Sequence, residues 1–547
     1  MKNKIIKMNT LFVLPIFCLF LISCGSNSND SNQNKEQGAN LLDESDIQTC
    51  RQNVNKKSAV KQRIAGQIKD VIQQKNAPFD WNNVGDDMFC DSFSLGDGIV
   101  TIGTTMTNTL IDNIGNITRL QAQIREHLPP PVIFHSRNNK LSLITLFLQS
   151  CAQLTTIREL PLVEFVELPY NSELDPIFQD SQRNAKSVQS CDDTVETDNP
   201  SENEEEQEGG AEDTEDEGIG EFNPGLYDPD DNHLRYDQYM NHIDTGVAGR
   251  MRRHNLDKVY DTYRYFGSDK IGIAVLDNGV LPERVTYLST GSSSFKIAGY
   301  FSAPFDSDSE FDGPHPMPYD VYGLPLLIPP LKSHGTDQSV NVFAMAPQSN
   351  RLSVRAANFM LLLHPNHTEG VTKAIIAVAD NPDIRIISMS MGNVFYSHQI
   401  KRAIDYFNNK GKIFVAAAGT SIKGVRDLVK IVFPARLPST ISITGILDTE
   451  ENNGEFILGS EAHGGPQNDF VIDYADASSP ATSSAAGMIA VLWSVNPSLS
   501  RSEIFEILKK SSTYYRQQRE KHPLFGWGKF DMLLAVERAM ETLSPKQ

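Results

Sequence analysis

The second half of the chain alternates between short apolar runs and stretches with helical spacing. The runs are rich in Val, Ile and Leu, which predicts buried β-strands. Strands that alternate with helices favour an α/β fold, in which helices cover both faces of a parallel sheet. In such sheets, functional residues gather beyond the carboxyl ends of the strands. The predicted strands are residues 270–276, 351–356, 384–388, 412–417 and 439–445, and the predicted helices are residues 333–344, 371–379 and 399–409.

A segment of small and apolar residues, 479–496, predicts a further helix, buried and about four turns long. Ser479 suits the N-cap, and Pro480 suits the first helical position, where a missing N–H costs no hydrogen bond. A hydroxyl at the positive end of a buried helix suits the nucleophile of an acyl-transfer enzyme, because nearby N–H groups can receive the negative charge that forms on attack. An ordinary N-cap on a core helix is the alternative interpretation.

Two more polar residues lie at junctions between predicted elements. Asp277 follows the apolar run KIGIAVL, and His334 opens a predicted helix within the sequence SHGT. An ionised aspartate can orient an imidazole, which takes the proton of a serine and returns it to the leaving group. Each signal is weak alone, but together Asp277, His334 and Ser479 predict a catalytic set.

The order Asp–His–Ser, with the motifs DNGV, SHGT and SSPATSSAAG, resembles that of the subtilisin-like serine peptidases. The agreement extends along nearly all of residues 235–547. It includes Ala-Pro at 346–347, the run IISMSMG at 386–392, Phe-Pro-Ala at 433–435, and the helix and Gly-x-Gly turn that close the chain.

The resemblance implies a serine endopeptidase of subtilisin-like fold. By it, Ser479 is the nucleophile that forms an acyl-enzyme, His334 is the general base and acid, and Asp277 orients His334. It also implies a strand edge that pairs with the peptide substrate, formed by Ser390, Met391 and Gly392.

Two departures from the family pattern concern the same site. The family usually has Gly-Asn after the strand at 412–417, with the asparagine amide donating to the oxyanion, whereas this chain has Gly419-Thr420. Losing that donor costs about 10²–10³ in turnover, a magnitude known from subtilisin itself. Thr420 has a hydroxyl but a shorter reach. The usual Gly-Thr-Ser is replaced by Ala477-Ser478-Ser479, so that Ser478 is an alternative nucleophile.

The N-terminal part of the chain contains a second predicted folded region, residues 56–170. Residues 56–75 predict an amphipathic helix. From about 97 to 170 the pattern is strand, helix, two strands, helix and strand, which predicts a small α+β domain of the βαββαβ type. By the family resemblance, this domain is propeptide-like: it would assist folding and occupy the cleft until autocleavage.

An acidic stretch separates the two folded regions. Residues 187–234 hold eighteen Asp and Glu and no Lys or Arg, so the remainder of the chain has a net charge of only about −2. Few apolar residues occur in 171–234, which predicts a disordered, solvated linker. With no basic patch or nucleic-acid motif, we expect no nucleic-acid partner.

The first residues resemble a bacterial lipoprotein signal. Three lysines precede the apolar run 11–22, and LISCG follows, which indicates a signal peptide at 1–23 and a lipid on Cys24. An uncleaved membrane anchor is the alternative, although the run is shorter than the roughly 20 residues that a spanning helix needs. Residues 24–55 would be a tether, and cleavage in the linker would release the peptidase from the cell membrane or outer membrane.

Four cysteines remain after the signal and Cys24. In an exported protein, Cys50, Cys90, Cys151 and Cys191 predict two disulfides, with three possible pairings.

The sequence therefore predicts an exported, lipid-anchored peptidase acting on proteins or peptides, with no required cofactor. Calcium is a possible ligand of the alternating acidic loop 306–312, for which a solvated loop is the simpler interpretation. Two other functions stay open: a catalytically impaired relative that binds peptides or a partner protein, and a peptidase that cleaves only its own propeptide.

Overall fold

The computed structural model describes residues 44–96, 98–129, 132–169, 174, 227–228, 233–234, 245–280, 285, 294–299, 334–357, 365–420, 429–447 and 454–543. The chain divides into two compact units, Met1–Asn55 and Lys56–Gln547. The predicted signal peptide, Cys24, Cys191, the acidic loop at 306–312 and most of the predicted linker lie outside the described residues. Within the described ranges, no helix is both long and apolar enough to cross a membrane.

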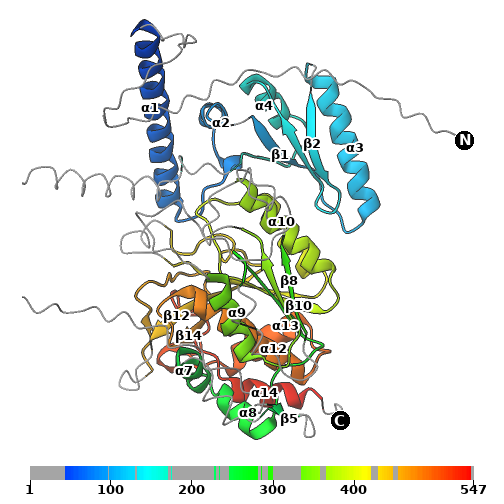
Figure 1. The fold of residues 1–547 in the computed structure, drawn as a ribbon, viewed down its shortest axis with the longest axis vertical. Helices are drawn as coiled ribbons and strands as arrows, with labels where there is room; N and C mark the ends of the chain where they lie inside the picture. The colour runs from blue at the N-terminus through cyan, green and yellow to red at the C-terminus, as the bar shows by residue number, and fades with distance from the viewer. Residues whose placement is uncertain are drawn as a thin grey trace, which may run out of the picture. The chain divides into compact units, whose positions relative to one another are not determined.

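The N-terminal region contains the predicted βαββαβ order. Its four strands form an antiparallel sheet in the order β2-β3-β1-β4, so β1 lies between β3 and β4. Figure 1 shows α3 beside these strands. The elements are α1 (Glu44–Lys75), η1 (Trp81–Asn83), α2 (Asp86–Phe93), β1 (Ile99–Gly103), α3 (Leu110–His127), β2 (Ile133–Asn138), β3 (Leu143–Phe147), α4 (Cys151–Arg158) and β4 (Phe165–Glu167).

Helix α1 begins earlier than the sequence predicts. Residues 44–55, which we expected to belong to the tether, are helical. Their sequence, ESDIQTCRQNVN, has too few apolar residues to show a helical period, so only the later residues of the same helix were recognisable.

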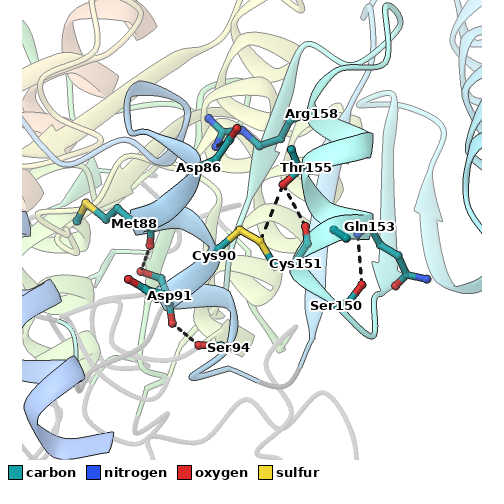
Figure 2. Close-up of a disulfide and its surroundings, with 12 residues drawn as sticks. Asp86, Met88, Cys90, Asp91, Ser94, Ser150, Cys151, Gln153, Thr155 and Arg158 are labelled. Carbon is teal, nitrogen blue, oxygen red and sulfur yellow. Dashed lines mark hydrogen bonds and ion pairs between the residues drawn. A yellow bond between two sulfur atoms is a disulfide. The ribbon is translucent and has the colours of Figure 1, made fainter. Parts of the chain in front are cut away.

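Within the described part of the chain, Cys90 in α2 forms a disulfide with Cys151 in α4 (Figure 2). It selects one of the three pairings that the sequence allowed for two disulfides. Arg158 on α4 strengthens the same junction: its guanidinium is 2.6 Å from the carboxylate of Asp86 and lies over the ring of Phe89. The short helix α2, which the sequence did not predict, is thereby fixed to the βαββαβ domain.

The C-terminal region forms an eight-stranded, mostly parallel sheet, as predicted. The order is β13-β12-β11-β10-β7-β9-β8, with β14 also pairing with β12, and only β13 runs antiparallel. The strands are β7 (Gly272–Asp277), β8 (Phe295–Gly299), β9 (Arg351–Arg355), β10 (Ile384–Met389), β11 (Ile413–Ala417), β12 (Ile441–Leu447), β13 (Ile457–Leu458) and β14 (Phe470–Asp473). At the end of the acidic linker, β5 (Tyr227–Asp228) pairs with β6 (His233–Leu234).

Helices cover both faces of this sheet. On β7, Ile273 and Val275 pack into one core with α9 and α12, whereas Ala274 and Leu276 pack into another core with α10 and α11. This alternation explains why residues 273–276 of the strand are all apolar. The helices are α7 (Thr245–Arg253), α8 (Leu256–Tyr263), α9 (His334–Met345), α10 (Pro365–Asp380), α11 (His398–Asn408), α12 (Ser478–Val495), α13 (Arg501–Ser511), η7 (Tyr515–Gln517) and α14 (Met532–Glu541).

The start of α12 differs from the sequence-based prediction. The N-cap is Ala477, not Ser479, and Pro480 is the third helical residue. Proline is tolerated there because the first four N–H groups of a helix have no partner within it. The cap comes from a distant residue: the hydroxyl of Thr420 accepts a hydrogen bond from the Ser478 N–H at 3.1 Å.

Candidate active site

Asp277 and His334 form a buried hydrogen-bonded pair. Asp277 is the last residue of β7, and His334 is the first residue of α9. The Nδ1 atom of His334 is 2.8 Å from Oδ1 of Asp277, and the two residues are only 8% and 1% exposed. A carboxylate on Nδ1 keeps the proton on that nitrogen, so Nε2 remains available to accept another.

The turn after Asp277 fits closely against the start of α9. The Gly335 N–H donates to the side-chain oxygen of Asn278 at 2.8 Å. A Cβ atom at Gly335 would lie 2.1 Å from the carbonyl oxygen of Gly279, so a larger residue would push the helix away. The motifs DNGV and SHGT therefore place the two polar side chains together.

The environment of His334 raises its pKa above the ordinary value of 6.5. Burial of the ring acts in the opposite direction, because it disfavours the cation, but the charge and the hydrogen bond of Asp277 outweigh it, with a further contribution from Asp337. Such a histidine is a stronger base than one in water.

Helices α9 and α12 pack against each other (Figure 1), and the order of the contacts along them shows that they run in the same direction. Ser483 donates a hydrogen bond to Gln338 at 2.9 Å, and one turn further along Gly487 lies against Met345, where a Cβ atom would approach to 2.4 Å. One turn before Ser483 is Ser479, and one turn before Gln338 is His334. Residues four apart share a helix face, so the facing sides of the two helices begin with His334 and Ser479.

Ser479 is also beside the predicted substrate-binding edge. The hydroxyl of Ser390, at the end of β10, donates to the carbonyl oxygen of Ser479 at 3.2 Å. Met391 is buried, and Gly392 packs against Val432, where a Cβ atom would lie 2.6 Å from a methyl group. Of the three predicted edge residues, Ser390 thus contacts the start of α12.

Ser478 and Ser479 have different surroundings. The Ser478 hydroxyl is fully buried, accepts from the Gly419 N–H at 3.2 Å and lies 2.9 Å from the hydroxyl of Thr420. Neither the hydroxyl nor the N–H of Ser479 bonds to any residue that the structure describes. Ser479 therefore presents, at the positive end of α12, a hydroxyl and an N–H that no described residue engages.

Thr420 is engaged by Ser478. Its hydroxyl oxygen accepts from the Ser478 N–H and pairs with the Ser478 hydroxyl. Either hydroxyl can be the donor in this pair, so the Thr420 proton is available to an oxyanion only when the Ser478 hydroxyl donates to Thr420.

Arg250 is a buried residue of the site region that the sequence gave no reason to single out. From α7 it donates to Ser484 on α12 at 2.9 Å and to Asn341 on α9 at 2.6 Å. It thus links the two helices that carry Ser479 and His334. Within the run GRMRR, nothing distinguishes this arginine from its exposed neighbour Arg252.

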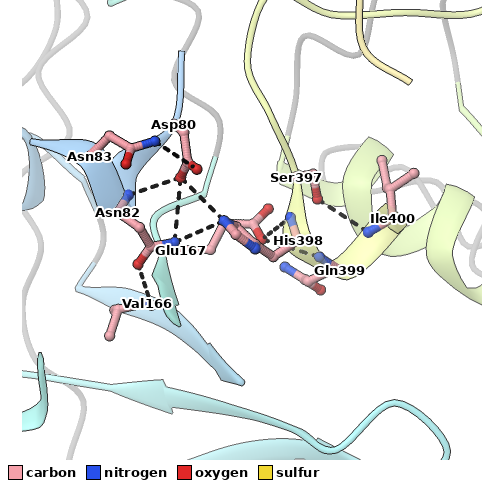
Figure 3. Close-up of polar contacts among 9 residues, drawn as sticks. All are labelled: Asp80, Asn82, Asn83, Val166, Glu167, Ser397, His398, Gln399 and Ile400. Carbon is pink, nitrogen blue, oxygen red and sulfur yellow. Dashed lines mark hydrogen bonds and ion pairs between the residues drawn. The ribbon is translucent and has the colours of Figure 1, made fainter. Parts of the chain in front are cut away.

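The N-terminal domain contacts the start of α11 in the C-terminal region through its last strand (Figure 3). The carboxylate of Glu167 in β4 accepts hydrogen bonds from the backbone N–H groups of His398 and Gln399, at 3.0 and 3.3 Å, at the start of α11. Burial raises the pKa of Glu167, although a bond from Ser397, the charge of His398 and the two N–H groups oppose it. Further along α11, Arg402 binds the carboxylate of Glu164 at 2.6 Å.

No cluster of three or more His, Cys, Asp or Glu side chains is placed to hold a metal ion in the part of the chain that the structure describes. The loop at 306–312, which we considered for calcium, is not part of it.

Comparison with known proteins finds a family match for the C-terminal region. Residues 268–528 match the family model described as the Subtilase family. The chain is 18% identical to a protease of Pseudoalteromonas arctica PAMC 21717, over 52% of this chain and 94% of that one, with a TM-score of 0.41. Fervidolysin from Fervidobacterium pennivorans, a keratinolytic enzyme related to subtilisin, is 15% identical over 81% of this chain and 61% of its own length, with a TM-score of 0.49. A lanthipeptide protease is 14% identical, over 54% of this chain and 98% of that one, with a TM-score of 0.39.

Proposed function

Because residues 268–528 belong to the subtilase family of serine peptidases, we propose that this chain is an endopeptidase whose catalytic residues are Ser479, His334 and Asp277. The bond between Asp277 and the first residue of α9, the helix that packs against α12, is the observation that carries this assignment. The natural substrates are proteins or peptides, whose chain would lie along Ser390–Gly392.

In the proposed reaction, Nε2 of His334 takes the proton of Ser479 as its oxygen attacks the peptide carbonyl. The negative charge of Asp277 stabilises the imidazolium that forms, and the N–H of Ser479 receives the oxyanion. His334 then protonates the departing amine, which leaves an acyl-enzyme on Ser479. A water molecule, deprotonated by His334, attacks the ester and frees the enzyme.

The identity of the nucleophile can be tested with a fluorophosphonate probe, which reacts with activated serines. We expect Ser479→Ala to lose labelling and peptidase activity. Ser478→Ala should still react, because its hydroxyl lies against Thr420 rather than on the face shared with His334. Labelling lost only in Ser478→Ala would overturn the assignment.

The impaired, peptide-binding alternative rests on Thr420, whose hydroxyl is engaged by Ser478. Thr420→Asn adds an amide donor at this position. If the missing donor limits turnover, kcat rises by about 10- to 10²-fold with little change in KM. Thr420→Ser, which keeps the hydroxyl, is the matched control. An asparagine variant no faster than the serine variant would show that the threonine is not the limiting feature.

We further propose that the N-terminal domain is propeptide-like and that the chain is exported with a lipid on Cys24 and cleaved in the acidic linker. The contacts of Glu167 and Glu164 with α11 support a docked N-terminal domain. The intact mass of the soluble chain from Gly25 tests the cleavage. Wild type should split between about residues 170 and 235, while Ser479→Ala stays whole. Wild type that remains uncut would contradict autoprocessing.

A further inference from the structure

A short segment ahead of the βαββαβ domain, residues 76–83, contacts the peptidase directly. The Phe79 N–H donates to the carbonyl oxygen of Val394 at 2.7 Å, and the Tyr396 N–H donates to the carbonyl oxygen of Phe79 at 2.7 Å. Phe79 and Phe395 thereby form a parallel β-bridge. The segment is added to the peptidase as a strand is added to a sheet edge, immediately after the substrate-binding edge at 390–392.

Aromatic side chains bury this contact. Phe79 is completely buried, and Trp81 and Phe395 are 4% and 7% exposed. The ring of Phe79 meets both others edge-on, with centroids 4.8 Å from Trp81 and 5.6 Å from Phe395, and Phe89 of α2 packs against Trp81. Large, fully desolvated aromatic residues are the usual anchors of protein interfaces.

Polar contacts hold both ends of the segment, and Figure 3 shows those at its C-terminal end. At its start, Arg436 of the peptidase donates to the carbonyl oxygen of Asn76 at 2.6 Å. At its end, the Nε2 atom of His398 lies 2.9 Å from the amide nitrogen of Asn82 and 3.2 Å from a carboxylate oxygen of Asp80. These contacts fix the backbone register on the peptidase.

The segment is also fixed to the βαββαβ domain. The side-chain oxygen of Asn82 accepts from the Val166 N–H of β4 at 3.1 Å. Arg158 on α4 donates to the carbonyl oxygen of Val84, and the Cys90–Cys151 disulfide joins the following helix to the same α4 (Figure 2). The segment is therefore expected to move with the βαββαβ domain as one unit.

We propose that residues 76–83 are a second docking element, separate from β4, and that they keep the N-terminal domain bound to the peptidase domain after the linker has been cut. Both elements lie upstream of the linker, so one cut between residues 175 and 226 leaves them on the same fragment. Cleavage then yields a two-chain complex rather than a free peptidase, and a lipid at the N-terminus would continue to hold the peptidase at the membrane. This inference does not depend on activity of Ser479.

The test uses the soluble chain from Gly25 carrying Ser479→Ala, with the recognition site of an added sequence-specific protease in the linker. After complete cutting, we expect the two fragments to co-elute in size exclusion and to remain together on dilution. Phe79→Ala with Trp81→Ala removes the aromatic anchors and should weaken association by about 100-fold or more. Arg436→Ala, on the peptidase side, should weaken it in the same direction.

Phe147→Ala is the matched control, because this phenylalanine of the same domain is 37% exposed and lies near Gly98. Circular dichroism of the uncut chains checks that every variant is folded. Fragments that separate in the wild-type background would overturn the proposal. So would anchor variants that are folded and hold together as firmly as Phe147→Ala.

Discussion

At the scale of single residues, the raised pKa of His334 has a direct consequence for pH dependence. A general base has to be neutral, so activity should fall as the pH drops through the pKa of His334, which lies above the ordinary 6.5. Asp277→Asn removes the charge that raises this pKa and leaves the burial that lowers it. We therefore expect the acid limb of kcat/KM to move to lower pH.

The same substitution should reduce kcat by about 10⁴-fold, because an amide can present its N–H group to Nδ1 and favour the wrong tautomer of the imidazole. A pH profile of kcat/KM on a peptide substrate measures both effects. An acid limb that stays in place would mean that a group other than His334 is titrating.

Residues at the ends of predicted strands and helices could be singled out from the sequence alone. Asp277 and His334 lie where a predicted strand ends and a predicted helix begins, so their contact at one edge of the sheet could be expected. The approach of Ser479 to this pair stays a prediction. The cap of α12 could not be expected, since Thr420 is 58 positions before the N–H group that it accepts. Sequence spacing therefore favoured Ser479 as the N-cap, whereas tertiary contact allows the helix to begin a residue earlier.

At the scale of elements, the relative position of α9 and α12 decides whether His334 can reach Ser479. Arg250 bonds to both helices, and a third, longer bond of 3.4 Å reaches the carbonyl oxygen of Tyr474 before α12. Tyr474 has a φ of 61°, which is unfavourable for a residue with a side chain. One planar guanidinium thus holds three groups that have to stay in register.

Arg250→Lys keeps the charge but loses the fork of donors. We expect kcat to fall by about 10- to 10²-fold while KM changes less, because a small misplacement of reacting groups slows chemistry more than binding. Arg252→Lys, on the exposed side of α7, is the control. A lower melting temperature with unchanged kcat in Arg250→Lys would assign Arg250 to stability alone.

Helices and strands could be predicted wherever their buried residues recur at a helical or strand spacing in the sequence. The five predicted strands of the C-terminal region are present as β7 and β9–β12 with small shifts of their ends, because both faces of each are buried and each reads as an apolar run. Helix α2 was missed, since its eight residues, DDMFCDSF, owe their position to the disulfide and to Arg158 rather than to a helical period.

At the scale of the whole molecule, docking of the two domains involves a buried carboxylate whose charge is unfavourable. The pKa of Glu167 is raised from 4.5, mainly by burial, so the folded chain binds this proton more tightly than the unfolded chain does. The resulting stabilisation is complete below the ordinary pKa and is lost as the pH rises through the raised value. At neutral pH, Glu167 therefore contributes its hydrogen bonds but also the cost of a desolvated charge.

Two substitutions separate these contributions. Glu167→Gln retains an oxygen for the N–H groups of His398 and Gln399 without the charge, so at neutral pH its melting temperature should equal or exceed that of the parent Ser479→Ala chain. Glu167→Ala leaves those donors without their acceptor and should cost about 1–3 kcal/mol. Thermal unfolding measured from acidic to neutral pH also tests the sign: the parent should lose stability relative to Glu167→Gln as the pH rises. If the glutamine variant were instead the less stable chain at neutral pH, the charge of Glu167 at the start of α11 would be favourable, and docking would strengthen rather than weaken as the carboxyl group ionises.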